Sequence, residues 1–276
     1  MDLRALCDLM DNLSRETWKG LTESVGLGIP WGEVTITDTL LRALARHARD
    51  HASEYTLEVR PVTQTKEGHI GADFEFWLAM PDGTYRAFSL QAKKAKPPLN
   101  PGYDVAYLTG GRKQYEVLLE HATIEPVVPL HLFYNGGYCA HAPFPDPPRE
   151  AMLYGCAIVP TMVVKSIDEE EGYKGAGRKS VMRYAPSSMP WSSIFRWPRD
   201  YQSWYGAGPA PAIPGLGEPF STNGTWEQWD NGLGLLDDGV PRIERLPPYV
   251  QESLGGLEND DPTLPAAVVV ISDPQG

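Results

Sequence analysis

The chain has 276 residues, of which 42% are hydrophobic and 22% are charged, and its formal net charge is −12. This composition supports a buried core and excludes a wholly disordered protein, while the negative charge argues against broad, non-specific binding to nucleic acid or anionic membranes. The acidity is uneven, because residues 201–276 contain eleven Asp and Glu but only two Arg. The preceding 200 residues are therefore much closer to neutral.

The cysteines and the apolar runs indicate in which cellular compartment the protein works. Cys7, Cys139 and Cys156 are odd in number and widely spaced, which predicts neither a disulfide framework nor a paired zinc site. No basic segment leads into a long apolar run near the N-terminus, and the run at 266–271 is too short to span a bilayer. We therefore expect a cytoplasmic protein that does not bind membranes.

The first half of the chain alternates between helical and strand periodicities. A threonine is expected to cap the second helix, with Glu33 just before it. A hairpin is expected between the second and third strands. In chain order, the predicted elements are helices at 2–19 and 38–50, strands at 57–61, 73–78 and 85–93, a helix at 112–122 and a strand at 127–134.

The second half is rich in proline and glycine, which interrupt most patterns. Its tryptophans could anchor the irregular loops: Trp191, Trp197, Trp204, Trp226 and Trp229. Only 157–165 and 266–272 are typical of strands. The sequence therefore predicts an α/β protein with an N-terminal helix at 1–30, a core at 31–138 and an irregular extension at 139–276. The extension either completes the same domain or forms a separate small module.

The predicted hairpin gathers polar side chains. Alternation places Asp73 and Glu75 on one face of the second strand and Gln91 and Lys93 on one face of the third. If the two faces coincide, they form an oxygen-rich site with one ammonium group. Mg²⁺ prefers such hard oxygen ligands, and a neighbouring lysine can orient water or stabilise charge on phosphorus. These residues suit the hydrolysis of a phosphodiester.

The same residues resemble the PD-(D/E)xK nuclease superfamily, whose core has the order helix, three strands, helix, strand. The match lies in Gly71-Ala72-Asp73 and Gln91-Ala92-Lys93. Glutamine in place of the usual acid is similar to the Q-x-K version of Mrr-like restriction endonucleases and some anti-phage effector nucleases. Residues 30–200 also resemble a bacterial domain family with a GADxExW motif, whose substrate is not settled.

The resemblance implies a restriction-endonuclease-like core and a cytoplasmic, Mg²⁺-dependent endonuclease that hydrolyses DNA, in a setting of bacterial anti-phage defence. Mn²⁺ is an alternative metal. By analogy with the superfamily, Glu33, Asp73, Glu75 and Gln91 would hold the metal. Lys93 would be catalytic, together with Asp73, Gln91 and Glu33.

A local group of basic residues could follow the phosphates of a nucleic acid. Gln114 on the next helix could support the site or contact the scissile strand. The basic residues with this predicted role are Lys94, Lys96, Arg112 and Lys113.

Several alternatives stay open at this stage. The two faces of the hairpin could be an ordinary solvated surface, with Glu75 and Lys93 forming a cross-strand pair. Gln91 in place of an acid also fits an inactive nuclease-fold module that binds nucleic acid or serves as a scaffold. The substrate could be RNA, and the partner could be a second copy of the chain or another defence protein.

Overall fold

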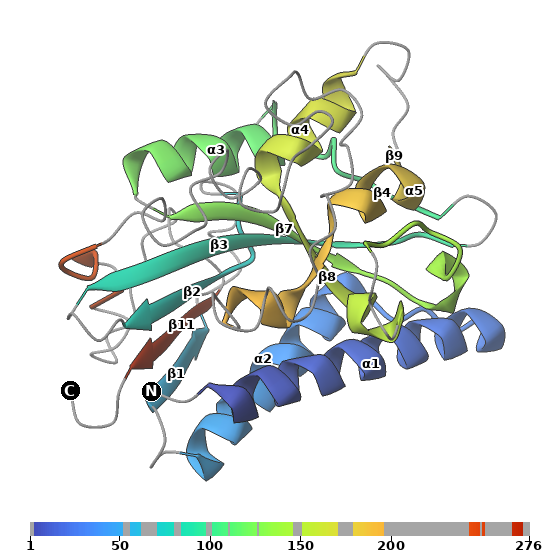
Figure 1. The fold of residues 1–276 in the computed structure, drawn as a ribbon. Coiled ribbons are helices and arrows are strands. Elements are labelled where there is room, and N and C mark those ends of the chain that lie inside the picture. The colour runs from blue at the N-terminus through green and yellow to red at the C-terminus, as the bar shows by residue number, and fades with distance from the viewer. Residues whose placement is uncertain are drawn as a thin grey trace.

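The computed structural model of this protein is a mixed α/β structure, with helices on both faces of its main sheet (Figure 1). α1 and α2 cover one face, and α3 and α4 cover the other. The structure describes residues 3–51, 56–61, 71–79, 84–97, 101–109, 111–125, 127–145, 151–170, 179–195, 243–248, 250–251 and 267–272.

Within these residues, the main sheet has seven strands in the order β1-β11-β2-β3-β7-β8-β10. Their bounds are Thr56–Pro61 (β1), Phe74–Ala79 (β2), Tyr85–Lys94 (β3), Val128–Tyr134 (β7), Cys156–Pro160 (β8), Met189–Pro190 (β10) and Ala267–Ser272 (β11). Two short antiparallel pairs lie beside it. They join Gly102–Tyr103 (β4) to Lys179–Ser180 (β9), and Leu108–Thr109 (β5) to Arg112–Lys113 (β6).

The helices differ widely in length. The α-helices are Arg4–Leu27 (α1), Glu33–Asp50 (α2), Gln114–Ile124 (α3), Thr161–Glu169 (α4) and Val181–Tyr184 (α5). Short 3₁₀ turns occupy Gly137–Cys139 (η2), Ala151–Gly155 (η3), Ala185–Ser187 (η4) and Trp191–Ile194 (η5).

The helix α2 begins earlier than the sequence predicted. Its first residue is Glu33 and its N-cap is Gly32, which has no side chain to donate or accept a bond, so the predicted threonine cap is wrong. A carboxylate in the first turn is favoured by the helix dipole, and Glu33 also accepts a backbone bond from β3. Glu33 therefore belongs to the helix, and a tertiary contact fixes its place.

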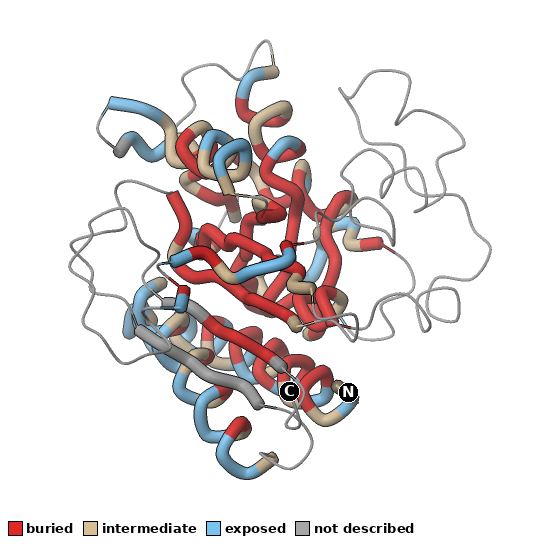
Figure 2. The backbone as a smooth tube through the Cα atoms, turned by 90° about the vertical axis from the view of Figure 1, so that its left-hand side faces the viewer, coloured by how far each residue is buried: buried red, intermediate tan, exposed pale blue. Residues whose placement is uncertain are grey.

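The centre of the sheet confirms the predicted hairpin. β2 and β3 pair antiparallel, and β3 and β7 pair parallel through a crossover that contains α3. On one face of β3, Phe88, Leu90 and Ala92 join the main hydrophobic core with residues of α1 and α2. Figure 2 shows these central strands as a continuous buried layer. Because both faces of β3 are covered, its polar side chains lie in the interior.

The second half of the chain contributes to the same sheet. β8, β10 and β11 all come from residues beyond 139, and β11 lies between β1 and β2, parallel to β2. The strand predicted at 157–165 is half wrong, because β8 ends at Pro160 and α4 follows. In α4, Val163, Val164 and Ile167 are buried at helical spacing. The α/β class is confirmed.

Trp191 is fully buried and donates from Nε1 to the carbonyl of Met10 at 2.8 Å. It therefore joins the second half of the chain to α1. The other tryptophans considered as anchors of this half, at positions 197, 204, 226 and 229, lie outside the described residues. Within the described residues, no helix combines the length and the apolar character needed to cross a bilayer.

The packing of η3 on α1 makes a test of the fold. A Cβ added at Gly155 would lie 1.9 Å from the backbone oxygen of Ser14, which cannot move without moving α1. We expect Gly155→Ala to lower the free energy of unfolding by roughly 2 kcal/mol or more in urea denaturation. Gly26→Ala is the matched control, because Gly26 is helical and meets nothing within 4 Å. The control should be neutral or stabilising by about 0.5 kcal/mol, and equal losses in both variants would contradict the packing.

Candidate active site

The pairing of β2 with β3 places the predicted polar residues together. Phe74 lies opposite Leu90 and Glu75 lies opposite Ser89, so Asp73 comes level with Gln91. The backbone N–H of Asp73 extends the ladder by donating to the carbonyl of Leu90 at 2.8 Å. The two polar faces of the hairpin therefore coincide, which the alternation of side chains alone had left open.

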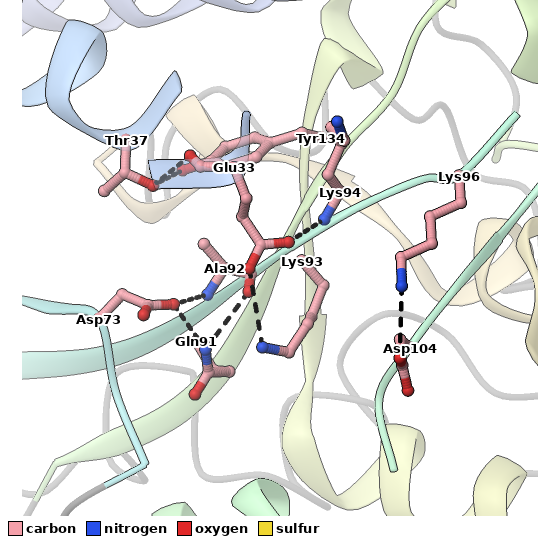
Figure 3. A network of polar contacts seen from close by, with 10 residues as sticks. All are labelled: Glu33, Thr37, Asp73, Gln91, Ala92, Lys93, Lys94, Lys96, Asp104 and Tyr134. Atoms are coloured by element: carbon pink, nitrogen blue, oxygen red, sulfur yellow. Dashed lines mark hydrogen bonds and ion pairs between the residues drawn. The ribbon is translucent and has the colours of Figure 1, made fainter. Parts of the chain in front are cut away.

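Asp73 is held by the strand beside it. Its Oδ2 accepts a bond from the backbone N–H of Ala92 at 2.5 Å and another from Gln91 Nε2 at 2.6 Å (Figure 3). Gln91 Nε2 also lies 3.3 Å from the carbonyl oxygen of Ala92. One amide group thus bridges a carboxylate and a backbone carbonyl, and both of these oxygens point to the same small volume.

Glu33 reaches this volume from α2. Its Oε2 accepts the backbone N–H of Lys94 at 2.6 Å, and its Oε1 lies 3.8 Å from Lys93 Nζ. The side chain of Lys93 is only 10% exposed, so its ammonium group is largely removed from water. Figure 3 shows Glu33, Lys93 and Gln91 converging above β3, close to Asp73. Four of the predicted site residues therefore meet.

Tyr134 lies beside Thr37 at the start of α2 and was missed by the sequence analysis (Figure 3). Its hydroxyl lies 2.9 Å from Thr37 Oγ1, and Thr37 donates to the carbonyl of Glu33 at 3.2 Å. Burial raises the pKa of Tyr134 well above its usual value, and the charges of Asp73 and Glu33 raise it further. Tyr134 and Thr37 tie the start of α2 to β7. A contact between residues 97 positions apart leaves no local sequence signal.

The donor set can be tested against the hard cation that the resemblance implies. Among the described residues, no group of three or more His, Cys, Asp and Glu gathers as a metal site. The group here instead offers the carboxylates of Asp73 and Glu33, the amide of Gln91 and the carbonyl of Ala92. Mg²⁺ is commonly held by one or two carboxylates and keeps several waters. Rotating the amide of Gln91 by 180° would turn its oxygen toward Asp73, so this set fits Mg²⁺.

Glu75 belongs to a different polar group. Its carboxylate is completely buried, and it accepts bonds from Trp77 Nε1 at 3.0 Å and Ser89 Oγ at 2.9 Å. His121 Nε2 on α3 lies 3.0 Å from Oε1 of the same carboxylate. The structure therefore does not bring Glu75 to the other predicted ligands. The spacing of His121 from Gln114 and Leu118 on one helix face could have revealed this partner.

The predicted basic residues have partners within the chain. Lys94 Nζ donates to the carbonyl of Trp31 at 2.6 Å. Lys96 pairs with Asp104 at 3.3 Å and Arg112 with Glu120 at 2.5 Å, and all four of these side chains are about half exposed. Such exposed pairs contribute little and can exchange their partners.

Lys113 differs from the exposed basic residues. Its Nζ lies 2.7 Å from Asp168 Oδ2 and donates to the hydroxyl of Tyr115 at 2.7 Å. The hydrogen bond to the buried Asp168 carboxylate is the main reason that the pKa of Lys113 is raised. Lys179 lies 3.8 Å from the other oxygen of Asp168. Lys113 thus joins α3 to α4, which gives it a structural role.

Gln114 is the first residue of α3 and packs on the segment that leads to Asp73. Gly71 has a φ of +71°, and a Cβ there would lie 2.6 Å from the carbonyl oxygen of Gln114. Gln114 Oε1 is buried and has no hydrogen-bond partner within the described residues. The structure therefore places Gln114 beside the backbone that leads to Asp73.

Comparison with known proteins connects the chain to one family. A model described as a family of unknown function, DUF6615, matches residues 6–276. No curated protein and no solved structure matches the chain.

The two groups of polar residues predict losses of stability that differ in size. Glu75→Ala would leave the buried donors of Trp77 and Ser89 without their acceptor, so we expect a loss of roughly 2 to 4 kcal/mol in the free energy of unfolding. Glu33→Ala should cost less, about 1 to 2 kcal/mol, because its side chain is 36% exposed although the substitution removes the counter-charge of Lys93. Chemical denaturation monitored by tryptophan fluorescence compares the two. A larger loss for Glu33→Ala would show that the assignment of roles is wrong.

Proposed function

Since the chain belongs to this family of unknown function, we propose its activity from the site itself: a metal-dependent nuclease that hydrolyses phosphodiester bonds of DNA. The observation that carries the proposal is the convergence of Asp73, Gln91 and Glu33 on one volume beside the buried ammonium group of Lys93. Two carboxylates next to a cation suit a reaction that develops negative charge on phosphorus and needs an activated water.

The arrangement of strands supports a restriction-endonuclease-like core. β2 and β3 form an antiparallel hairpin, α3 follows, and β7 returns parallel to β3. This is the order helix, three strands, helix, strand that the resemblance implies, with β11 added between β1 and β2. The site residues lie toward the end of β3 that meets the start of α2.

Asp73, Gln91 and Glu33 would hold the metal, with the carbonyl of Ala92 as a further oxygen donor. A bound Mg²⁺ supplies an activated water and neutralises charge on the phosphate oxygens. Asp73 is oriented for this role because the N–H of Ala92 fixes its Oδ2. Glu33 would align Lys93 from the other side through their ion pair. Lys93 is then placed to bind a phosphate oxygen or to orient the attacking water.

Gln91 is the residue on which activity depends most sensitively. In the structure its amide nitrogen faces Asp73 Oδ2 and the carbonyl oxygen of Ala92, the two oxygens that a cation would also contact. An amide has one acceptor and two donors, so a rotation about its last side-chain bond exchanges the two faces. The same residue can thus stabilise the site without metal through nitrogen and bind metal through oxygen.

This feature also favours the second candidate function, a nuclease-fold module that binds nucleic acid or acts as a scaffold without cutting. Because Gln91 already satisfies Asp73, the site can persist with no metal. Titration calorimetry with Mn²⁺ separates the candidates, because a scaffold of this kind should show no binding that depends on Asp73. RNA as the substrate, and a role in anti-phage defence with a second copy or another protein as partner, stay predictions.

One test of the proposed function concerns cleavage. We expect Asp73→Asn and Lys93→Met each to lower Mg²⁺-dependent cleavage of DNA by at least about 100-fold, because each removes a charge placed at the reacting phosphate. The measurement is single-turnover cleavage of labelled DNA, with RNA as a parallel substrate. Asp38→Asn and Lys19→Met are matched controls, because both are exposed and lie on α2 and α1 away from the site. Cleavage that persists in both site variants would exclude this site as the catalytic centre.

A further test measures stability and does not depend on cleavage activity. Gln91→Glu places a carboxylate where an amide donates to Asp73, so without metal we expect the free energy of unfolding to fall by roughly 1 to 3 kcal/mol. Mg²⁺ should restore this loss and stabilise the variant more than the native chain, since a ligand that binds the folded state raises its stability. Thermal unfolding with and without Mg²⁺ measures both effects. Equal effects of Mg²⁺ on Gln91→Glu and Gln91→Leu would contradict a metal at this position.

A further inference from the structure

A histidine lies next to the proposed catalytic group and was not among the predicted site residues. β7 runs parallel to β3, with His131 paired to Gln91 and Phe133 paired to Lys93. Paired residues of neighbouring strands point to the same face of a sheet. His131 therefore lies on the face that carries Gln91 and Lys93, one strand further from Asp73.

The ring of His131 is held at one nitrogen only. It is completely buried, and its Nδ1 lies 3.1 Å from the hydroxyl of Thr161 at the start of α4. Its Nε2 is buried as well and has no hydrogen-bond partner within the described residues. A buried polar atom without a partner costs free energy, and an apolar side chain would fill the same space without that cost. The nitrogen therefore calls for an explanation beyond packing.

Burial, together with the charge of Lys93, lowers the pKa of His131 to about 3. The ring is therefore neutral at ordinary pH, and Lys93 is close enough for its charge to act on it. A neutral imidazole carries an unprotonated nitrogen that can accept a hydrogen bond. A protonated ring beside Lys93 would instead repel the ammonium group.

The ammonium group of Lys93 requires hydrogen-bond acceptors. Its ammonium group has three N–H donors, its side chain is 10% exposed, and its ion pair with Glu33 is 3.8 Å long, which exceeds hydrogen-bond distance. An ammonium group removed from water requires acceptors as well as a counter-charge. Glu33 supplies the counter-charge from α2, and His131 offers an acceptor from β7.

Two other roles for His131 fit less well. A general base must reach the substrate and titrate near the working pH, whereas this ring is completely buried and its pKa is about 3. A ligand for Mg²⁺ would be an oxygen rather than an imidazole nitrogen. A role through Lys93 is the one that its position and its neutral state both support.

We propose that His131 is a positioning residue for Lys93: Thr161 holds the ring at Nδ1–H, and the unprotonated Nε2 accepts a hydrogen bond from the Lys93 ammonium group as Lys93 acts on the phosphate. This inference rests on the proposed nuclease function. It assigns the buried His131 and Thr161 to the support of the site, so the contact between β7 and α4 would help to position Lys93.

Two substitutions separate positioning from packing. The side-chain amide of Asn reaches the place of Nδ1 and that of Gln reaches the place of Nε2. We expect His131→Asn to lower kcat for DNA cleavage by about 10- to 100-fold, the range found for residues that orient a catalytic group. His131→Gln should restore kcat to within about fivefold of the native chain. KM for DNA and the half-saturating Mg²⁺ concentration should stay within about twofold in both variants.

Equal kcat values in the Asn and Gln variants, whether both native or both reduced, would overturn the proposal, and so would a loss confined to KM. Urea denaturation of both variants provides the control for packing. A loss of kcat that follows the loss of stability in both would also count against positioning.

A spectroscopic test stands apart from cleavage. In the full-length chain labelled with ¹⁵N-histidine, long-range ¹⁵N–¹H correlation spectra report which ring nitrogen carries the proton, and His131→Gln identifies the signals. We expect a protonated Nδ1 and an unprotonated Nε2, with the Nε2 shift changing in Lys93→Met and unchanged in Lys19→Met. A protonated Nε2, or no response to Lys93→Met, would overturn the inference. A chain that cleaves no nucleic acid would instead refute the proposed function, and the spectrum would still test the hydrogen bond between His131 and Lys93.

Discussion

The antiparallel pairing of β2 with β3 is the interaction on which the site depends. It sets Glu75 opposite Ser89 and so brings Asp73 level with Gln91. Because side chains alternate between faces, a slip of one residue would turn Asp73 toward the hydrophobic core of α1 and α2. Two bonds at Asp73 prevent such a slip: its backbone N–H donates to Leu90, and its carboxylate accepts from the N–H of Ala92. The polar group is therefore part of the ladder that positions it.

The same face of β2 carries two carboxylates with different surroundings. Glu75 lies deep in the sheet under α3, where indole, hydroxyl and imidazole groups contact both of its oxygens. Asp73 lies at the start of the strand, where an adjustable amide contacts one oxygen. A buried carboxylate held by several side-chain donors stabilises the fold, and a partly exposed one beside an amide that has both a donor and an acceptor can exchange its partner. Position along the strand thus separates a structural acid from a candidate ligand.

The sequence predicted the local features well, because strand alternation needs only neighbouring residues. Phe74 to Leu78, Phe88 to Lys93 and the hairpin between them follow from that pattern. It could not predict contacts made across the sheet or by distant segments. The early start of α2 depends on the bond from Lys94 to Glu33, and β11 joins the sheet from residues almost 200 positions beyond β2. The analogy with the superfamily implied that Glu75 is a metal ligand, and the bond from His121 on α3 is a contact between distant segments that the strand pattern does not show.

Charge explains how an acidic chain could bind a nucleic acid. Lys96 and Arg112 are already paired with Asp104 and Glu120, so the positive charge of these two residues is neutralised by the paired carboxylates. Both pairs are half exposed, however, and such pairs contribute about 0 to 1 kcal/mol. A phosphate can replace the carboxylate at little cost, and the released carboxylate returns to water. Binding of this kind is weak for any single phosphate and strongly reduced by salt. Under the proposed function, selectivity would then come from the buried group around Lys93, where a charge is held in place before the substrate arrives.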